Sequence, residues 1–568
     1  MKTNNISRSI SRPITNRIYS QVNSPQVRRA SGPTYLAETL AYQTRVEAAG
    51  GTMTADGLAL VDAIFANAVT QGITIQRGYV FGTAVNLNAA TRTILEMTGN
   101  GQSFVADSSS NDSTVHVGLG SLCHDGTTAQ QGYFALSSDQ LFTNTDWTML
   151  VYFQKPLIDT TGSGVNGQIL SQYSTSAAGN VVINAGITGN VTFQPIGGGT
   201  SINFVSRNTT HSGGSIIEPV PMFITYNSAT RAISIYDPLT PQLNTGGVMP
   251  VNFLGSRPTR LGAAQIATAA SNGPRGQGYF GILKYDGILT TTQMDSIWST
   301  FKTYHQKICN YVLIYGNSVT SGADAQEGGL NSARNWPHQF SRVALRNNCI
   351  TIRPFTMGGK QLYYMRDTDF VKPTGSSYPG SYAAVTLSPT YAQDSVNYWG
   401  PRWSPNILVL DENQNTAANA SVNVTYAIDW AGTEGNPGIA RHVINKLRGY
   451  NSDLVVVAGT MLAVGPDGKS YATIIAEETS IPSKWRKNLR DWSAAIRADT
   501  EGLYDAVYDL YTDFNLGWGS DGNAADPTND YPNGNPTLFY DDHQHPNLAG
   551  HTLMTTGYWT AVNSVRLY

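Results

Sequence analysis

The sequence has few charged residues and few cysteines, and it lacks a long apolar run. Charged residues make up 13% of the 568 positions, and the net charge of −3 excludes a strong global attraction to nucleic acid or to a membrane surface. The cysteines, Cys123, Cys309 and Cys349, are an odd number at wide spacing, which indicates neither a disulfide framework nor a zinc site. No run of about 18 apolar residues occurs, so we predict no membrane insertion. Residues 1–29 also lack the apolar segment of a secretion signal.

Small polar residues and tyrosine are abundant instead. The chain holds 56 glycines, and its 30 tyrosines exceed its 17 phenylalanines. This composition favours β-rich extracellular or virion proteins, in which turns are many and aromatic and amide groups contact sugars. A chain of this length is expected to form two or three domains.

Residues 1–35 form a basic arm without an acidic residue. Two interpretations stay open for it: a disordered basic tail, or an arm that orders on a larger assembly. Its positive charges are Lys2, Arg8, Arg12, Arg17, Arg28 and Arg29.

Residues 36–75 are predicted to form a small helical module. Apolar residues at helical spacing are followed by Ala49-Gly50-Gly51, which ends a first helix, and Thr54 is placed to cap a second. The stretch "YQTRVEAAGGTMTADGLALVDAIFANAVTQG" resembles a helical module of bacteriophage tail and structural proteins.

Residues 76–305 alternate with period two and are predicted to form a β-sandwich. The stretches "WTMLVYFQKP", "PMFITYNSATRAISIYD" and "GYFGILKYDGILTTTQMDSIWSTFK" resemble the laminin-G/concanavalin-like jelly roll, in which a late strand leads into a helix. The predicted strands are Tyr133–Leu136, Trp147–Phe153, Gly167–Ser171, Val181–Ile183, Val191–Gln194, Pro221–Tyr226, Ala232–Tyr236 and Gly278–Tyr285.

Residues 306–568 are predicted to form a doubly wound α/β domain. The apolar runs Tyr311–Tyr315, Ile407–Leu410 and Leu454–Gly459 look like buried parallel strands. Helix-like segments alternate with them, at 334–346, 438–447, 484–496 and 548–562.

Two motifs in this domain carry the residue types of acyl-transfer chemistry. Ser318 follows the first apolar run in "GNSVTSG", at the end of a strand where α/β sheets place ligands. Near the C-terminus, Asp542 precedes His545 by three residues in "DDHQHPNLAGH", so the carboxylate can orient the ring that acts as general base. Alternatives are a Gly-Ser turn, a polar loop, or a His/Asp metal site, although Pro546 disfavours the helix that such metal spacing needs.

Together, "GNSVTSG" and "DDHQHPNLAGH" resemble the first and last blocks of the SGNH/GDSL hydrolases. The resemblance implies a three-layer, flavodoxin-like fold and a serine esterase that needs no cofactor, with Ser318, Asp542 and His545 as its triad. It also implies an oxyanion hole formed by the Ser318 N–H, the Gly359 N–H and the Asn413 side chain, with Gly358 as the alternative to Gly359.

Three residues depart from the family pattern and leave a non-catalytic copy possible. Asn317 replaces an Asp beside the nucleophile, Asp411 replaces a Gly, and Gln414 replaces an Asp. A further segment, Gly517–Pro536, holds candidate calcium ligands but lacks the EF-hand register. These ligands are Asp521, Asn523, Asp526 and Asp530.

The combined pattern resembles a bacteriophage tail-spike or tail-fibre protein that removes O-acetyl groups from a host surface polysaccharide. Expected partners are that bacterial polysaccharide, other tail proteins contacted through the arm, and further copies of the chain. A virion location is expected, and no nucleic-acid partner. We also predict that a fragment starting near Cys309 keeps esterase activity. The alternative is a structural or adhesive virion protein that only binds glycan.

Overall fold

The computed structural model describes a large part of the chain, in separate ranges. These are residues 34–81, 84–85, 93–106, 115–117, 122–124, 134–136, 140–154, 167–172, 178–185, 191–204, 217–254, 259–261, 278–316, 318–321, 335–353, 369–376, 396–411, 426–462, 483–514, 535–540 and 545–567. The chain divides into two units, Met1–Tyr35 and Leu36–Tyr568. Apart from Thr34 and Tyr35, the basic arm lies outside the described residues.

The two helices expected after the arm are present. Helix α1 spans Ala37–Ala48 and α2 spans Ala55–Gln71. The Thr54 side chain accepts a hydrogen bond from the Gly57 N–H at 3.0 Å, which confirms the predicted cap. Helix α2 packs on a later helix, α3 (Thr291–His305), where Asn67 donates to the Ser296 hydroxyl at 2.8 Å.

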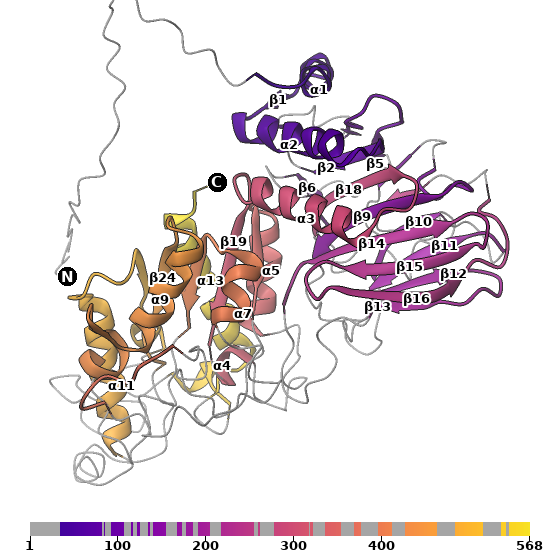
Figure 1. The fold of residues 1–568 in the computed structure, drawn as a ribbon. Coiled ribbons are helices and arrows are strands. Elements are labelled where there is room, and N and C mark those ends of the chain that lie inside the picture. Colours follow the sequence, from indigo (N-terminus) through magenta and orange to yellow (C-terminus); the bar gives the residue numbers. More distant parts are fainter. Residues whose placement is uncertain are drawn as a thin grey trace, which may run out of the picture. The chain divides into compact units, whose positions relative to one another are not determined.

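Two antiparallel sheets form the middle of the chain (Figure 1). The first has the order β13 (Ile202–Phe204), β12 (Val191–Pro195), β11 (Val181–Ala185), β10 (Gly167–Gln172), β17 (Arg260–Leu261), β8 (Phe134–Ala135), β5 (Phe104–Ala106), β4 (Thr93–Ile94). The second has the order β16 (Gln242–Val248), β15 (Ala232–Asp237), β14 (Val220–Asn227), β9 (Trp147–Gln154), β18 (Gly278–Asp286), β7 (Leu122–His124), β6 (Val115–Val117), and β2 (Ile75–Val80) also pairs with β18.

Each predicted strand of this region overlaps an observed strand, although Tyr133 lies outside the described residues. The strands that were not predicted are mostly short. Strands of two or three residues, such as β4, β13 and β17, cannot show a period in the sequence. They are fixed by pairing with the longer strands beside them.

The position of strand β9 in the sheet explains why "WTMLVYFQ" is mostly apolar. Its residues alternate between faces, and every one of them is buried. Trp147 and Phe153 belong to the core between the two antiparallel sheets, whereas Leu150 and Tyr152 belong to a second core, which also contains α2, α3 and the parallel sheet described below. The second sheet is therefore covered on both faces.

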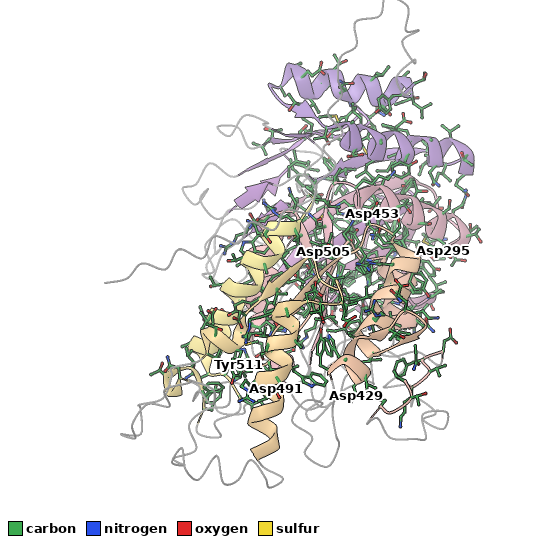
Figure 2. All side chains as sticks on the ribbon, turned by 90° about the vertical axis from the view of Figure 1, so that its left-hand side faces the viewer. Asp295, Asp429, Asp453, Asp491, Asp505 and Tyr511 are labelled. Atoms are coloured by element: carbon green, nitrogen blue, oxygen red, sulfur yellow. The ribbon has the colours of Figure 1, made fainter. Side chains whose placement is uncertain are left out.

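Helix α3 covers the outer face of that sheet. Its first turn is a capping box in which Thr290 and Gln293 bond reciprocally, as the "TTTQ" pattern indicates. Asp295, labelled in Figure 2, accepts a hydrogen bond from the Tyr236 hydroxyl of β15 at 2.6 Å and fastens the helix to the sheet.

The C-terminal part is built on a five-stranded parallel sheet. Its order is β20 (Cys349–Ile352), β19 (Asn310–Tyr315), β21 (Ile407–Leu410), β24 (Val455–Gly459), β25 (Ala506–Tyr508). In chain order this is 2-1-3-4-5, the doubly wound arrangement of flavodoxin-like folds. The three predicted strands are confirmed; the short β20 and β25 were not predicted. Asp505, also labelled in Figure 2, aligns the last pair by accepting from the Val456 N–H at 2.9 Å.

Helices alternate with these strands, as expected. They are α4 (Ser318–Ser321), α5 (Trp336–Leu345), α7 (Val396–Trp403), α9 (Ile439–Tyr450), α11 (Ser483–Ala498), α12 (Leu510–Asp513) and α13 (Leu548–Val565), with a π-helix at Tyr426–Ala431. The four helices predicted from periodicity correspond to α5, α9, α11 and α13. Among the described residues, no helix combines the length and apolarity that crossing a bilayer requires.

Buried polar contacts join the second antiparallel sheet to the parallel sheet. The hydroxyls of Tyr152 and Tyr311 lie 3.0 Å apart. Ile217 and Arg353 exchange two backbone hydrogen bonds, at 2.7 and 3.2 Å. Glu218 pairs with Arg402 at 2.5 Å, and both side chains are at most 6% exposed. A fragment starting near Cys309 would lose the partners of Tyr311, Arg353 and Arg402. The activity of such a fragment stays a prediction.

Candidate active site

The candidate site lies where the carboxyl ends of β19 and β21 meet. The chain leaves β19 for β20 on one side, while β21 pairs on the other, so this is the switch point at which doubly wound sheets bind ligands. The Asp411 N–H, just after β21, donates to the Tyr315 carbonyl at 2.8 Å and holds the two strand ends together. Helix α4 begins at Ser318, three residues after β19 ends. Nothing is described of the Ser318 side chain.

Gly316 allows the turn from β19 into α4. A Cβ on this residue would lie 1.6 Å from Thr320 Oγ1 and 2.6 Å from Thr320 Cβ. The glycine of the motif is therefore required because Thr320 occupies the space beside it.

Thr320 fixes α4 through both its side chain and its backbone. Its hydroxyl donates to Asp411 Oδ2, and its carbonyl accepts from an Arg353 guanidinium nitrogen at 2.8 Å. Burial lowers the pKa of Arg353 to about 9, so this guanidinium still carries its charge at neutral pH.

The Asp411 carboxylate is the centre of a buried polar cluster. Besides Thr320, it accepts from the Tyr558 hydroxyl at 2.6 Å and from Trp336 Nε1 at 3.1 Å. Burial raises the pKa of Asp411 to about 6, and the hydrogen bonds from Thr320, Tyr558 and Trp336 oppose that rise. At neutral pH the group is mainly ionised and accepts all three bonds.

His545 lies in a closed loop just before α13. The Tyr540 N–H donates to the His545 carbonyl at 3.0 Å, and Phe539 pairs with Pro546. Asn547 caps α13 by accepting from the Gly550 N–H at 3.1 Å. These contacts hold the two ends of the segment that contains Asp542, which itself lies outside the described residues.

His551 connects this loop to the buried cluster. Its Nδ1 accepts from the Trp336 N–H at 3.4 Å, and the Trp336 ring stacks on Tyr558 with ring centroids 4.4 Å apart. Burial, and then the neighbouring charge of His545, lower the pKa of His551 to about 3. His551 is thus neutral at physiological pH and close enough to His545 for the two rings to interact electrostatically.

The structure therefore places the start of α4, at Ser318, and the His545 loop on elements joined by one set of buried contacts. Gly359, Asn413 and Asp542 lie outside the described residues, so the predicted triad and oxyanion hole stay predictions. The candidate calcium ligands of 517–536 lie outside them as well. Within the described ranges, no group of three or more potential metal ligands occurs.

The sequence did not reveal four residues of this cluster as a group: Thr320, Trp336, Asp411 and Tyr558. Asp411 was noticed only as a departure from the family pattern. Its position directly after a buried strand was a usable signal, because side chains at that edge of an α/β sheet face the ligand site.

No family model and no curated protein matches this chain. Among solved structures, the botulinum neurotoxin serotype D binding domain is 11% identical, with a TM-score of 0.28 over 42% of this chain and 53% of its own. TesA is 9% identical, with a TM-score of 0.27 over 45% of this chain and 99% of its own. An extracellular lipase from Streptomyces rimosus is 15% identical, with a TM-score of 0.27 over 45% of this chain and 100% of its own. This chain spans only about half of the first of these proteins. Similarity at this level defines neither a family nor an activity.

Proposed function

We propose that the α/β domain is a serine ester hydrolase of the SGNH type. Ser318 attacks the ester carbonyl, His545 takes its proton, and Asp542 orients His545. The Ser318 N–H, the Gly359 N–H and the Asn413 amide hold the oxyanion. The alcohol leaves with a proton from His545, and water then releases the acid from the acyl-enzyme.

One observation carries this proposal. Ser318 begins α4 at the switch point of the 2-1-3-4-5 sheet, and α13, the helix that follows the His545 loop, bonds to Asp411 at the same edge through Tyr558. The two residues are 227 positions apart in the sequence (545 minus 318). The first motif supplies a serine as the nucleophile, and the second motif, later in the chain, supplies a histidine as the base.

We extend the proposal to substrate and setting from the sequence resemblances. The substrate is an O-acetylated bacterial surface polysaccharide, and the antiparallel sheets form a concanavalin-like sandwich that contacts it. The protein acts on the host surface as a homo-oligomeric part of a phage tail, attached through residues 1–35. No cofactor takes part.

The test compares hydrolysis of p-nitrophenyl acetate by the wild-type chain and by Ser318→Ala. We expect the variant to lose at least ~10³-fold in kcat/KM, because the nucleophile is removed. Ser299→Ala, an exposed serine of α3, serves as the matched control and should keep wild-type activity. Acetate release from an O-acetylated capsular polysaccharide then tests the substrate class.

Two outcomes would reject the proposal. Equal rates for the wild type and Ser318→Ala would exclude this serine as the nucleophile. Retained binding of the polysaccharide by a wild-type chain that hydrolyses neither ester would instead support the adhesive alternative.

A further inference from the structure

We propose that Asp411 is a positioning residue for the nucleophile, because its buried carboxylate fixes α4 relative to the helix that follows the His545 loop. The inference rests on the proposed esterase function. It assigns a role to a residue that stands where the family pattern has glycine.

The geometry of the three donors supports this role. They come from three separate elements: Thr320 from α4, Trp336 from the start of α5, and Tyr558 from α13. Thr320 is two residues from Ser318 in a helix of only four residues, so a movement of Thr320 moves Ser318. Asp411 itself is anchored, since its N–H bonds to the last residue of β19.

The chemistry of the three donors requires an ionised acceptor. The Trp336 indole N–H can only donate, and Tyr558 and Thr320 both direct their hydroxyl protons at the carboxylate. A carboxylate has enough lone pairs for all three, whereas a carboxamide would turn its NH₂ group toward at least one donor. Asp411 and the three donors are at most 4% exposed, so water cannot replace a lost partner.

A second contact restrains α4 from the opposite direction. The Arg353 guanidinium bonds to the Thr320 carbonyl from the end of β20, and Arg353 also bonds through its backbone to Ile217. Thr320 is therefore held between an anionic group just after β21 and a cationic group just after β20. Releasing the Asp411 side would leave α4 free to shift toward Arg353.

The test uses single variants of the full chain with p-nitrophenyl acetate. Asp411→Asn and Thr320→Val should each lower kcat by about 10- to 100-fold with KM changed less than about threefold, because a shift of about 1 Å at the nucleophile costs on that order. Thr320→Ser keeps the hydroxyl and should restore kcat to within about threefold of the wild type. Tyr558→Phe should lower kcat in the same direction as Thr320→Val.

Asp237→Asn is the matched control. Asp237, the last residue of β15, is also a buried carboxylate, and it accepts hydrogen bonds from the nearby Leu239 N–H and Thr240 hydroxyl. Its replacement should lower Tm and leave kcat per folded molecule unchanged.

The outcomes separate this inference from the proposed function. If Ser318→Ala is inactive but Asp411→Asn and Thr320→Val keep wild-type kcat, the positioning role is wrong and the esterase stands. If Ser318→Ala is as active as the wild type, the proposed function itself fails. If Asp411→Asn does not fold, the comparison of Thr320→Val with Thr320→Ser decides: equal kcat values overturn the inference.

Discussion

Replacing Gly316 by alanine should lower the proposed esterase activity through a displacement of α4 whose size follows from the structure. The added Cβ would lie 2.6 Å from Thr320 Cβ, while ordinary contacts begin at about 3.4 Å. Rotation of the Thr320 side chain removes the closer clash with its hydroxyl but cannot move its Cβ. The backbone of α4 must therefore move by about 0.8 Å, the difference between 3.4 and 2.6 Å.

That movement has a direct kinetic consequence. A displacement of about 1 Å at a reacting group can cost about 10²-fold in rate, equivalent to about 3 kcal/mol of transition-state stabilisation. It also separates Thr320 from Asp411. We expect Gly316→Ala to lower kcat for p-nitrophenyl acetate by about 10²-fold in a chain that still folds.

Gly449→Ala provides the control for the alanine substitution itself. Gly449 lies in α9, and nothing lies within 4 Å of its added Cβ. This change should leave kcat unaltered and stabilise the helix by up to about 1 kcal/mol. A Gly316→Ala enzyme with kcat within twofold of the wild type, and with an unchanged Tm, would refute the reasoning.

Three further predictions concern the rest of the molecule. Glu218→Ala removes the buried carboxylate that pairs with Arg402 and should lower the free energy of unfolding by about 3–5 kcal/mol, measured as a lower urea midpoint. Lys446→Ala, at an exposed ion pair, is the control and should lower it by less than about 1 kcal/mol. His551 has a folded-state pKa of about 3, below its ordinary 6.5, so its contribution to stability is full above pH 6.5 and is lost as the pH falls toward 3. The loss of stability is roughly 5 kcal/mol at most. His551→Asn should therefore make Tm depend less on pH between 6.5 and 3, and a curve of Tm against pH parallel to that of the wild type would contradict this prediction. Deletion of residues 1–35 should leave esterase kcat unchanged and abolish incorporation into the particle; a large loss of kcat in folded protein would show a further role for the arm.

The order of the elements could be predicted because their apolar patterns are local. The runs at 311–315 and 407–410 are long enough to be identified as buried strands, and the caps at Thr54, Thr290 and Asn547 are signalled by neighbouring residues. Strand β20 was missed because Thr351 interrupts its apolar residues, so its four residues form no continuous apolar run. Its place at the edge of the sheet follows only from pairing with β19.

The contacts between the C-terminal domain and the second antiparallel sheet could not be predicted, for a similar reason. Tyr152 looks like an ordinary strand residue, and Tyr311 looks like the second residue of another strand. Nothing in either segment indicates that their hydroxyls meet at 3.0 Å in a shared core. Contacts between segments 159 residues apart are set by the packing of whole sheets, which no local pattern encodes.

The cluster around Asp411 could not be predicted from local patterns either. It shows what allows an aspartate to stand where the family pattern has glycine. A carboxylate at the end of β21 is buried, so its charge is tolerated only because Thr320, Trp336 and Tyr558 supply donors there. With glycine at this position, the hydrogen bonds that these three donors make to the carboxylate would be lost. Asp411 and its donors therefore depend on one another. Asp411→Gly should therefore destabilise this chain, although the family pattern has glycine at this position. Combining it with Thr320→Val, Trp336→Phe and Tyr558→Phe should recover part of the stability that Asp411→Gly alone loses. If the quadruple variant is no more stable than Asp411→Gly, the stability that Asp411→Gly loses does not come from the three donors, and the mutual dependence is wrong.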